Sequence, residues 1–389
     1  MKRSTRLIHL GRPERTGHGP RTVNHPVVRA STVLFDSTAQ MADARRRRDT
    51  ERLFTYGVRG TPTAFALEDV IADLEGGFGA KLYPSGQAAV AGAMLAFLKP
   101  GDHVLVTDSV YQPVRRLFAR HLEARGIQVD YYRPDGSDIP DLIRPETRLI
   151  HAESPGSFTM EMQDIRALAD IAHDAGALLS VDNTWASGWA FQPLAHGADL
   201  SILAATKYVC GHSDVMMGTV TTTEAHYQTL HDSWLTLGTV VSADDCALAL
   251  RGVRTLPIRF DAHGRHAMAV ANHLAARPEI ADVLYPPRAG DAGHALFTRD
   301  FTAAAGLMTV AFHADVPRAR VEAMVDALDL FGIGASWGGF ESLALICDLS
   351  NRRADADIRS GIHLRLHIGL EDPDDLIADL DAAMLALGG

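Results

Sequence analysis

The chain has 389 residues, and 37 Lys and Arg side chains against 48 Asp and Glu give it a formal net charge of −11. Apolar residues make up 47% and charged residues 22%, which is typical of a globular enzyme and excludes a disordered or collagen-like chain. At roughly 150 residues per domain, the length predicts two or three domains. The acidic balance also argues against a dedicated nucleic-acid binder, which needs basic side chains to meet phosphates.

The cysteine and histidine patterns bear on compartment and metal binding. Cys210, Cys246 and Cys347 are odd in number and form no CxxC pair, which argues against a disulfide framework and a structural zinc site. The 18 histidines show no HExxH or comparable spacing, so no metal site is predicted. No apolar stretch follows Lys2 and Arg3, and no apolar run approaches the ~18 residues of a membrane span. We therefore expect a cytoplasmic protein without a membrane partner.

The first sixty residues show scattered Gly and Pro and few periodic apolar positions. This pattern predicts an irregular segment, either disordered or an arm that packs on something else. The four arginines at 45–48 lie among acidic residues, which is typical of a solvated helix face.

Beyond residue 80 the pattern becomes regular. Strands are expected at 81–84, 103–108, 126–132, 148–153, 177–182 and 199–204. Helices are expected at 85–98, 114–125 and 165–175. Such alternation predicts βαβ units and a mostly parallel sheet that is covered on both faces.

From about residue 251 the composition shifts toward helix. Strand candidates at 306–312 and 365–369 and a C-terminal helix from residue 373 predict a second, smaller domain. We expect an arm over 1–60, a large domain over 61–250 and a C-terminal domain over 251–389.

Ligands bind at the carboxyl ends of the strands in sheets of this kind. The segments that follow the predicted strands are 85–86, 108–111, 153–157, 182–183 and 206–207. These segments are the first place to look for functional side chains.

Lysine is scarce, with only Lys2, Lys81, Lys99 and Lys207 in the chain. If the chemistry needs an amine nucleophile, the terminal Lys2, the turn residue Lys99 and the strand residue Lys81 are poor candidates. Lys207 ends an apolar run, where burial would lower its pKa and favour covalent amine chemistry. The structural alternative is a partly buried lysine that pairs with an acid.

Other residues at strand ends offer complementary chemistry. Asp182 could cap the sheet edge, bind a metal or keep a pyridine nitrogen protonated. Ser85 and Gly86 stand at a strand-to-helix junction, where backbone N–H groups favour a phosphate. Tyr111 could stack on a planar ring.

Several long segments resemble one enzyme family. The stretch SVDNTWASGWAFQPLAHGADLSILAATKYVCGHSDVMMG is similar to the cofactor-lysine region of the Cys/Met-metabolism family of pyridoxal-phosphate (PLP) enzymes. Further segments that carry the resemblance, from about residue 32 to the C-terminus, are ESPGSFTMEMQD, DFTAAAGL, SWGGFESL and RLHIGLED. Within the family, the chain is most similar to the bacterial cystathionine β-lyases. The resemblance implies an α/β fold of the aspartate-aminotransferase-like (type I) PLP-dependent class, with a mostly parallel sheet in the large domain and a smaller C-terminal α/β domain.

The resemblance also implies the site residues. Lys207 would hold PLP covalently, Asp182 would pair with its pyridine nitrogen and Tyr111 would stack on its ring. The implied phosphate ligands are Ser85, Gly86, Gln87 and Thr206, with Tyr56 and Arg59 from a neighbouring subunit. The implied substrate-binding residues are Arg365, which would clamp the α-carboxylate as a bidentate fork, Ser336, Trp337 and Tyr56. Lys207, Tyr111 and Asp182 would be the catalytic residues.

The chain departs from the family pattern at the phosphate arginine. Family members usually read Tyr-x-Arg, whereas here Tyr56 is followed by Gly57, Val58 and then Arg59. The phosphate arginine is therefore shifted or lost.

Two tryptophans distinguish the reaction type. Trp185 and Trp337 match the β-eliminating members, although each is equally plausible as a core residue. The expected reaction is α,β-elimination of L-cystathionine to L-homocysteine, pyruvate and ammonia, in a homotetramer built from dimers with shared active sites. The alternatives are a broad cysteine-S-conjugate β-lyase or cysteine desulfhydrase, a γ-acting relative, and an idle PLP-fold regulator.

Overall fold

The computed structural model describes residues 1–13, 20–353 and 361–387. Its helices are α1 (Arg3–His9), α2 (Thr38–Arg47), α3 (Pro62–Glu75), α4 (Gly86–Phe97), α5 (Gln112–Leu117), α6 (Ile139–Leu142), α7 (Ile165–Asp174), α8 (Glu224–Thr236), α9 (Ala243–Val253), α10 (Leu256–Leu274), α11 (His294–Asp300), α12 (Arg318–Asp326) and α13 (Pro373–Met384). Its strands are β1 (Gly79–Tyr83), β2 (His103–Thr107), β3 (Gln128–Tyr132), β4 (Thr147–Glu153), β5 (Leu178–Asp182), β6 (Leu200–Leu203), β7 (Gly218–Thr222), β8 (Ile280–Leu284), β9 (Leu307–Phe312), β10 (Gly332–Ile333), β11 (Leu343–Ile346) and β12 (His363–His367).

The larger sheet, within the described residues, has seven strands in the order β1-β7-β6-β5-β4-β2-β3. Strands β2 to β6 run parallel, whereas β7 runs antiparallel to both β1 and β6. The mostly parallel sheet was predicted, but β7 was not. Its sequence, Gly-Thr-Val-Thr-Thr, is buried throughout but has Val220 as its one apolar side chain, so it lacks the apolar run that marks a buried strand.

Each face of the larger sheet has its own core, because successive strand residues point to opposite faces. Val104 and Val106 of β2 join the core formed with α4 and α8, whereas Leu105 joins the core formed with α3 and α7. The second core continues into the C-terminal part, where Leu364 of β12 and Leu376 of α13 belong to it. One continuous core therefore ties the two sheets together.

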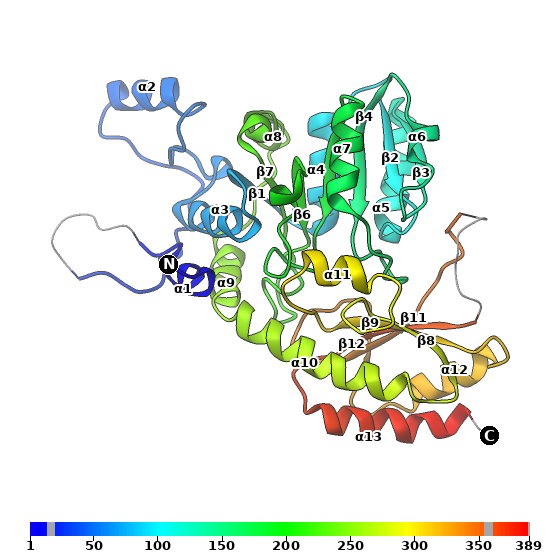
Figure 1. Ribbon diagram of the computed structural model, residues 1–389. Coiled ribbons are helices and arrows are strands. Elements are labelled where there is room, and N and C mark those ends of the chain that lie inside the picture. Colours follow the sequence, from blue (N-terminus) through cyan, green and yellow to red (C-terminus); the bar gives the residue numbers. More distant parts are fainter. Residues whose placement is uncertain (14–19, 354–360, 388–389) are drawn as a thin grey trace.

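The smaller sheet has the order β10-β11-β12-β9-β8 among the described residues, with β12 paired on both edges. Figure 1 shows it in the lower part of the molecule, with α10, α12 and α13 beside it. The predicted strand at 306–312 corresponds to β9. The predicted strand at 365–369 begins two residues earlier, as β12 at 363.

Two helices lie in the N-terminal sixty residues, where the sequence predicted an irregular segment. Helix α1 buries Leu7, and Arg3 donates hydrogen bonds to Trp189 O (2.7 Å) and Leu74 O (2.5 Å). That prediction was wrong here because a seven-residue helix that buries a single apolar side chain leaves almost no periodic signal.

Helix α2 projects from the body, as Figure 1 shows, and buries none of its residues. The arginines of the basic run form ion pairs on its exposed face, where Arg46 and Arg47 contact Asp43. The prediction of a solvated helix face is confirmed for this run.

None of the helices in the described part of the chain is long and apolar enough to cross a membrane. Cys210, Cys246 and Cys347 are all buried and free. No group of three or more potential metal-binding side chains occurs among the described residues.

Candidate active site

A cavity of about 380 Å³ lies between the carboxyl ends of the parallel strands and the smaller sheet. Segments that follow β1, β2, β4, β5 and β6 line one side, and residues of β9 and β12, with the segment that follows β10, line the other. The predicted site residues that line it are Ser85, Gly86, Gln87, Tyr111, Asp182, Thr206, Lys207, Ser336, Trp337 and Arg365. The fold therefore brings together residues that are up to 280 positions apart in sequence (365 − 85).

Lys207 lies in the turn after β6. Its Nζ donates a hydrogen bond to Ser336 Oγ (2.9 Å) and lies 5.2 Å from the centre of the Trp337 ring. Burial, assisted by the positive charge of Arg365 and opposed by Asp182, lowers the pKa of Lys207 to about 8. A pKa of about 8 leaves roughly a tenth of the amine neutral at pH 7, several hundred times more than for an exposed lysine. The structural alternative was that Lys207 pairs directly with an acidic side chain. Its Nζ donates instead to the hydroxyl of Ser336.

Asp182 ends β5, and Thr184 supports it. Asp182 Oδ1 accepts hydrogen bonds from Thr184 N (3.0 Å) and Thr184 Oγ1 (2.5 Å). Thr184 Oγ1 in turn accepts from Ala204 N (2.9 Å), which links the ends of β5 and β6. Burial raises the pKa of Asp182, while both bonds from Thr184 lower it and favour the charged carboxylate. Thr184 was not among the predicted site residues, although it stands two residues after the aspartate, the spacing of an Asx turn.

The start of α4 forms a cradle, at Ser85 and Gly86, whose chemistry suits an anion. Ser85 caps the helix by accepting a hydrogen bond from Ala88 N (3.1 Å), and the first N–H groups of a helix have no partners within it. A Cβ on Gly86 would lie 2.6 Å from Ala204 Cβ, so only glycine lets the helix start this close to the end of β6. Thr206 borders the cradle, and its Oγ1 accepts from Met217 N (2.9 Å).

Tyr111 precedes α5 at the cavity wall, with 44% of its surface exposed. Its backbone N–H donates to Glu153 Oε2 (2.7 Å), at the end of β4. Partial burial raises the pKa of the Tyr111 hydroxyl, and Arg365 opposes that shift. Burial, assisted by the nearby Asp182, raises the pKa of Glu153 well above its ordinary value. Glu153 lies in a segment that the strand-end rule selects, but its own role was not foreseen.

Arg365 projects from β12 into the cavity. Its Nη2 donates to Ala335 O (2.8 Å) and Ser336 O (3.1 Å), and its guanidinium lies 5.7 Å from the centre of the Phe158 ring. Burial lowers the pKa of Arg365. Arginine remains charged in proteins, so this side chain is a cation next to Lys207 and suits a carboxylate ligand.

Tyr56 and Arg59 do not line this cavity. Arg59 Nη2 donates to Asp49 Oδ1 (2.5 Å) and Arg48 O (2.7 Å), and the Tyr56 side chain is exposed. Their predicted contact with a cofactor phosphate stays a prediction about a neighbouring copy of the chain.

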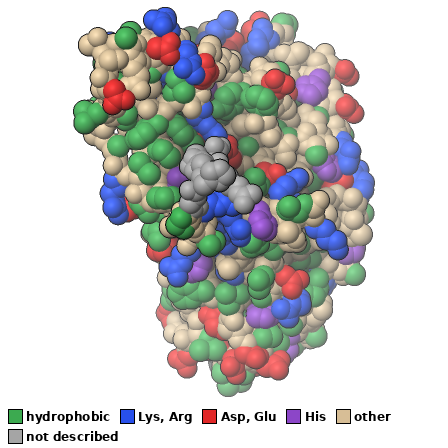
Figure 2. Space-filling model, turned by 90° about the vertical axis from the view of Figure 1, so that its left-hand side faces the viewer, with side chains coloured by type: hydrophobic (Ala, Val, Ile, Leu, Met, Phe, Trp, Pro, Cys, Tyr) green, Lys and Arg blue, Asp and Glu red, His purple; other side chains and the backbone are tan. Residues whose placement is uncertain are grey.

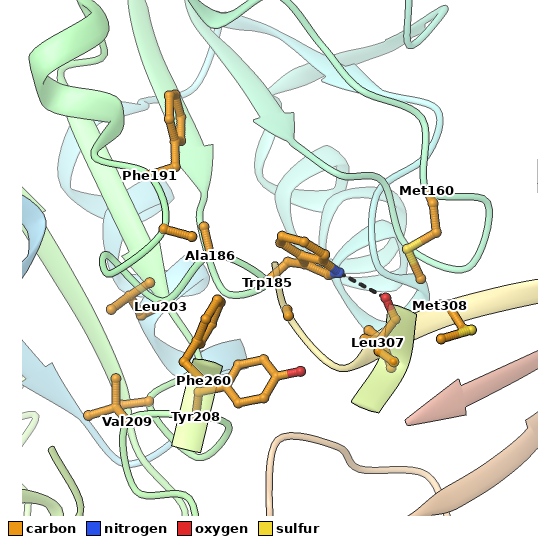
Figure 3. Packing of buried hydrophobic residues seen from close by; sticks show 14 of the residues in the cluster. Met160, Trp185, Ala186, Phe191, Leu203, Tyr208, Val209, Phe260, Leu307 and Met308 are labelled. Carbon is orange, nitrogen blue, oxygen red and sulfur yellow. Dashed lines mark hydrogen bonds between the residues drawn. The ribbon is translucent and has the colours of Figure 1, made fainter. Parts of the chain in front are cut away.

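Trp185 is both a core residue and a cavity residue. It is buried, it lines the cavity, and its indole N–H donates to Leu307 O (3.1 Å), as Figure 3 shows. Its ring also packs edge-on against Phe297 and Phe301. This tryptophan therefore fixes the position of β9 relative to the end of β5.

Comparison with known proteins identifies the family. A family model described as Cys/Met metabolism PLP-dependent enzyme matches residues 4–385. A cystathionine beta-lyase of Bordetella avium is 46% identical, with 98% of this chain and 96% of the relative covered. Cystathionine beta-lyase MetC of Escherichia coli K12 is 40% identical, with 98% of each chain covered.

The crystal structure of metB from Corynebacterium glutamicum superimposes with a TM-score of 0.90 at 29% identity, covering 100% of this chain and 98% of that one. This likeness confirms the predicted type I PLP fold, and the family match confirms PLP as the predicted cofactor. Because the match spans nearly the whole sequence, the chain belongs to the Cys/Met metabolism PLP-dependent enzyme family.

Proposed function

We propose that the protein catalyses α,β-elimination of L-cystathionine, which with one water yields L-homocysteine, pyruvate and ammonia. The observation that carries the proposal is the convergence of Lys207, Asp182 and Arg365 on one cavity. Similarity to cystathionine beta-lyases over nearly the whole chain supports this substrate.

The cavity residues fit PLP. Lys207 offers a partly neutral amine for covalent attachment, and Asp182 offers a carboxylate for a protonated ring nitrogen. The cradle at Ser85, Gly86 and Thr206 suits a phosphate, because it combines a helix N-terminus with hydroxyl groups. When bound, PLP withdraws electrons and so stabilises negative charge at the substrate Cα.

The chain's own residues then perform the proton transfers. Arg365 binds the substrate α-carboxylate in a bidentate contact with its planar guanidinium. The Lys207 amine removes the Cα proton, since its lowered pKa suits a general base near neutral pH. Lys207 or the Tyr111 hydroxyl then donates a proton to the departing sulfur as the Cβ–S bond breaks. Trp337 and Trp185 line the cavity and exclude water from it.

The alternatives differ in their products. A γ-acting enzyme would release 2-oxobutyrate instead of pyruvate, and a broad S-conjugate lyase would release pyruvate equally well from many cysteine thioethers. An idle regulator is disfavoured by the hydrogen-bonded placement of Lys207 and Asp182 in one cavity.

Assays of the purified protein with L-cystathionine and PLP, using coupled pyruvate detection, test the proposal. Pyruvate release that disappears in Lys207→Ala is the expected result. Release of 2-oxobutyrate, or full activity in the Lys207→Ala variant, would refute it.

We further infer a homotetramer built from dimers that share active sites. Tyr56 and Arg59 lie outside the cavity of their own chain, so any contact with a cofactor must be made in a second copy. Apolar side chains are also exposed within the arm and at the start of α10, including Leu34 (90%) and Ile258 (74%). Figure 2 shows hydrophobic side chains gathered on the face that forms the left-hand side of Figure 1. Mixing an Arg59→Ala chain with a Lys207→Ala chain should restore activity in hybrid dimers, and light scattering should give the mass of a tetramer.

We propose an N-terminal arm over residues 1–60, a PLP-binding domain over 61–250 and a C-terminal domain over 251–389. Strands β1 to β7 all lie in one sheet and β8 to β12 in the other, and the second boundary falls in the last turn of α9, shortly before α10 begins. We also place the protein in the cytoplasm, because three free thiols suit a reducing compartment.

A further inference from the structure

Segment 336–339, the Ser-Trp-Gly-Gly turn, covers Lys207. Ser336 Oγ accepts from Lys207 Nζ, and the Trp337 ring lies 5.2 Å from the same atom. The backbone is equally close, since a Cβ on Gly338 would lie 2.8 Å from Tyr208 N and 3.0 Å from Lys207 Cα. The surroundings of the amine therefore depend on how firmly this turn is held.

Strand β12 holds the turn at two points. Arg365 and His367 are two residues apart, so their side chains project from the same face of the strand. Arg365 donates to Ala335 O and Ser336 O, and Gly338 N donates to His367 Nε2 (3.0 Å). Because β12 is paired with both β9 and β11, it provides a rigid base.

The bond to Gly338 requires a neutral imidazole with its lone pair on Nε2. His367 is fully buried among Tyr208 and His263, and burial, together with His263, holds its pKa well below the ordinary value. A proton on Nε2 would turn that nitrogen toward Gly339 O (3.2 Å) and leave Gly338 N–H without its acceptor. The tautomer that accepts from Gly338 carries its proton on Nδ1, which has no hydrogen-bond partner among the described residues. It is still the favoured tautomer because the Gly338 N–H points at Nε2, where a second proton would repel it.

We propose that His367 is a positioning residue of the active site, which holds residues 336–339 against Lys207 through its bond to Gly338 N–H. The inference rests on the proposed function only in that Lys207 is taken as the PLP-binding lysine. His367 acts through the turn, since it does not line the cavity.

Three variants separate this role from simple packing. His367→Phe keeps an aromatic ring but removes the acceptor, whereas His367→Gln places an amide oxygen where Nε2 lies. His263→Phe is the matched control, because His263 is a buried neighbour with ring centres 5.2 Å apart whose Nδ1 donates to Ile368 O and not to the turn. Should His367→Phe fail to fold, His367→Asn, whose amide is too short to reach Gly338, replaces it.

The measurement is the pH dependence of the rate at which PLP-free, full-length protein forms a borohydride-trappable link to PLP. The midpoint of this rate profile reports the pKa of the Lys207 amine. Thermal melting of each variant reports its stability in parallel. Asp182 and Arg365, the charged groups that perturb this amine, are present in every variant.

In the wild type we expect a midpoint near the pKa of about 8. Loosening the turn admits water to Lys207 and relieves its desolvation, so the midpoint in His367→Phe should rise by at least half a unit, with about threefold slower capture at pH 7. His367→Gln should restore the midpoint, and His263→Phe should lose stability without moving it.

A His367→Phe midpoint equal to that of His263→Phe would overturn the positioning role and leave His367 as a packing residue. If even the wild type formed no link to PLP, the proposed function would fail, and this inference with it. The two failures are therefore distinguishable.

Discussion

Removal of the Thr184 hydroxyl tests how the site keeps Asp182 charged. Thr184→Val keeps the shape of the side chain and the backbone bond from Thr184 N, but it removes the 2.5 Å bond from Oγ1 to Asp182 Oδ1. A hydrogen bond to a charged group contributes about 1.5–3 kcal/mol, which equals about 1–2 pKa units at 1.36 kcal/mol per unit.

The direction of the pKa shift follows from which form of Asp182 the hydrogen bond stabilises. The bond from Thr184 favours the carboxylate and lowers the Asp182 pKa, so its loss raises that pKa further. The carboxylate is then lost at a higher pH as the solution is acidified. The acid limb of the kcat/KM profile with L-cystathionine should therefore move up by about 1–2 units.

Thr184→Ser provides the control, because serine keeps the hydroxyl. We expect its acid limb to stay with that of the wild type, while Thr184→Val alone is displaced. If the acid limbs of the Thr184→Val and Thr184→Ser profiles fell at the same pH, the hydroxyl of Thr184 would not lower the pKa of Asp182 and the reasoning would be refuted. Melting temperatures of both variants separate this effect from the loss of the bond between Ala204 N and Thr184 Oγ1.

Three further outcomes are expected. Gly86→Ala places a Cβ 2.6 Å from Ala204 Cβ, so the affinity for PLP, measured by equilibrium dialysis, should fall about tenfold. Adding Ala204→Gly should restore part of that affinity, and an unchanged affinity in Gly86→Ala would contradict the steric argument. Because the pKa of Lys207 is lowered to about 8, the rate of PLP attachment should rise with pH and level off above pH 8. A midpoint of that rate profile near the ordinary 10.5 would mean that the amine is exposed to water. Arg365→Lys removes the planar guanidinium that can bind a carboxylate with two parallel hydrogen bonds, so KM for L-cystathionine should rise at least about tenfold with a smaller change in kcat. An unaltered KM would show that the substrate carboxylate binds elsewhere.

The sequence was informative wherever a short run of residues carries its own signal. Strands β2 and β5 are mostly apolar, β4 has Leu149 and Ile150 near its centre, and all three end in polar residues, so both their positions and the functional edge of the sheet could be predicted. Lys207 and Asp182 stood out for the same reason, as polar residues at the ends of apolar runs. Strand β7 and helix α1 gave no such signal and were missed.

The tertiary structure decided which distant residues meet. Thr184 reaches Asp182 only because the chain turns back after β5, and Glu153 reaches Tyr111 N only because β4 and β2 are neighbours in the sheet. No local pattern encodes the contact of His367 with Gly338, which depends on how the smaller sheet packs against the turn after β6. Each helix or strand can be predicted from nearby residues, because the spacing of apolar side chains is a local property. The environment of Lys207 instead depends on contacts such as that with Ser336, more than a hundred residues away, and these form only when both sheets bury their apolar side chains in a shared core.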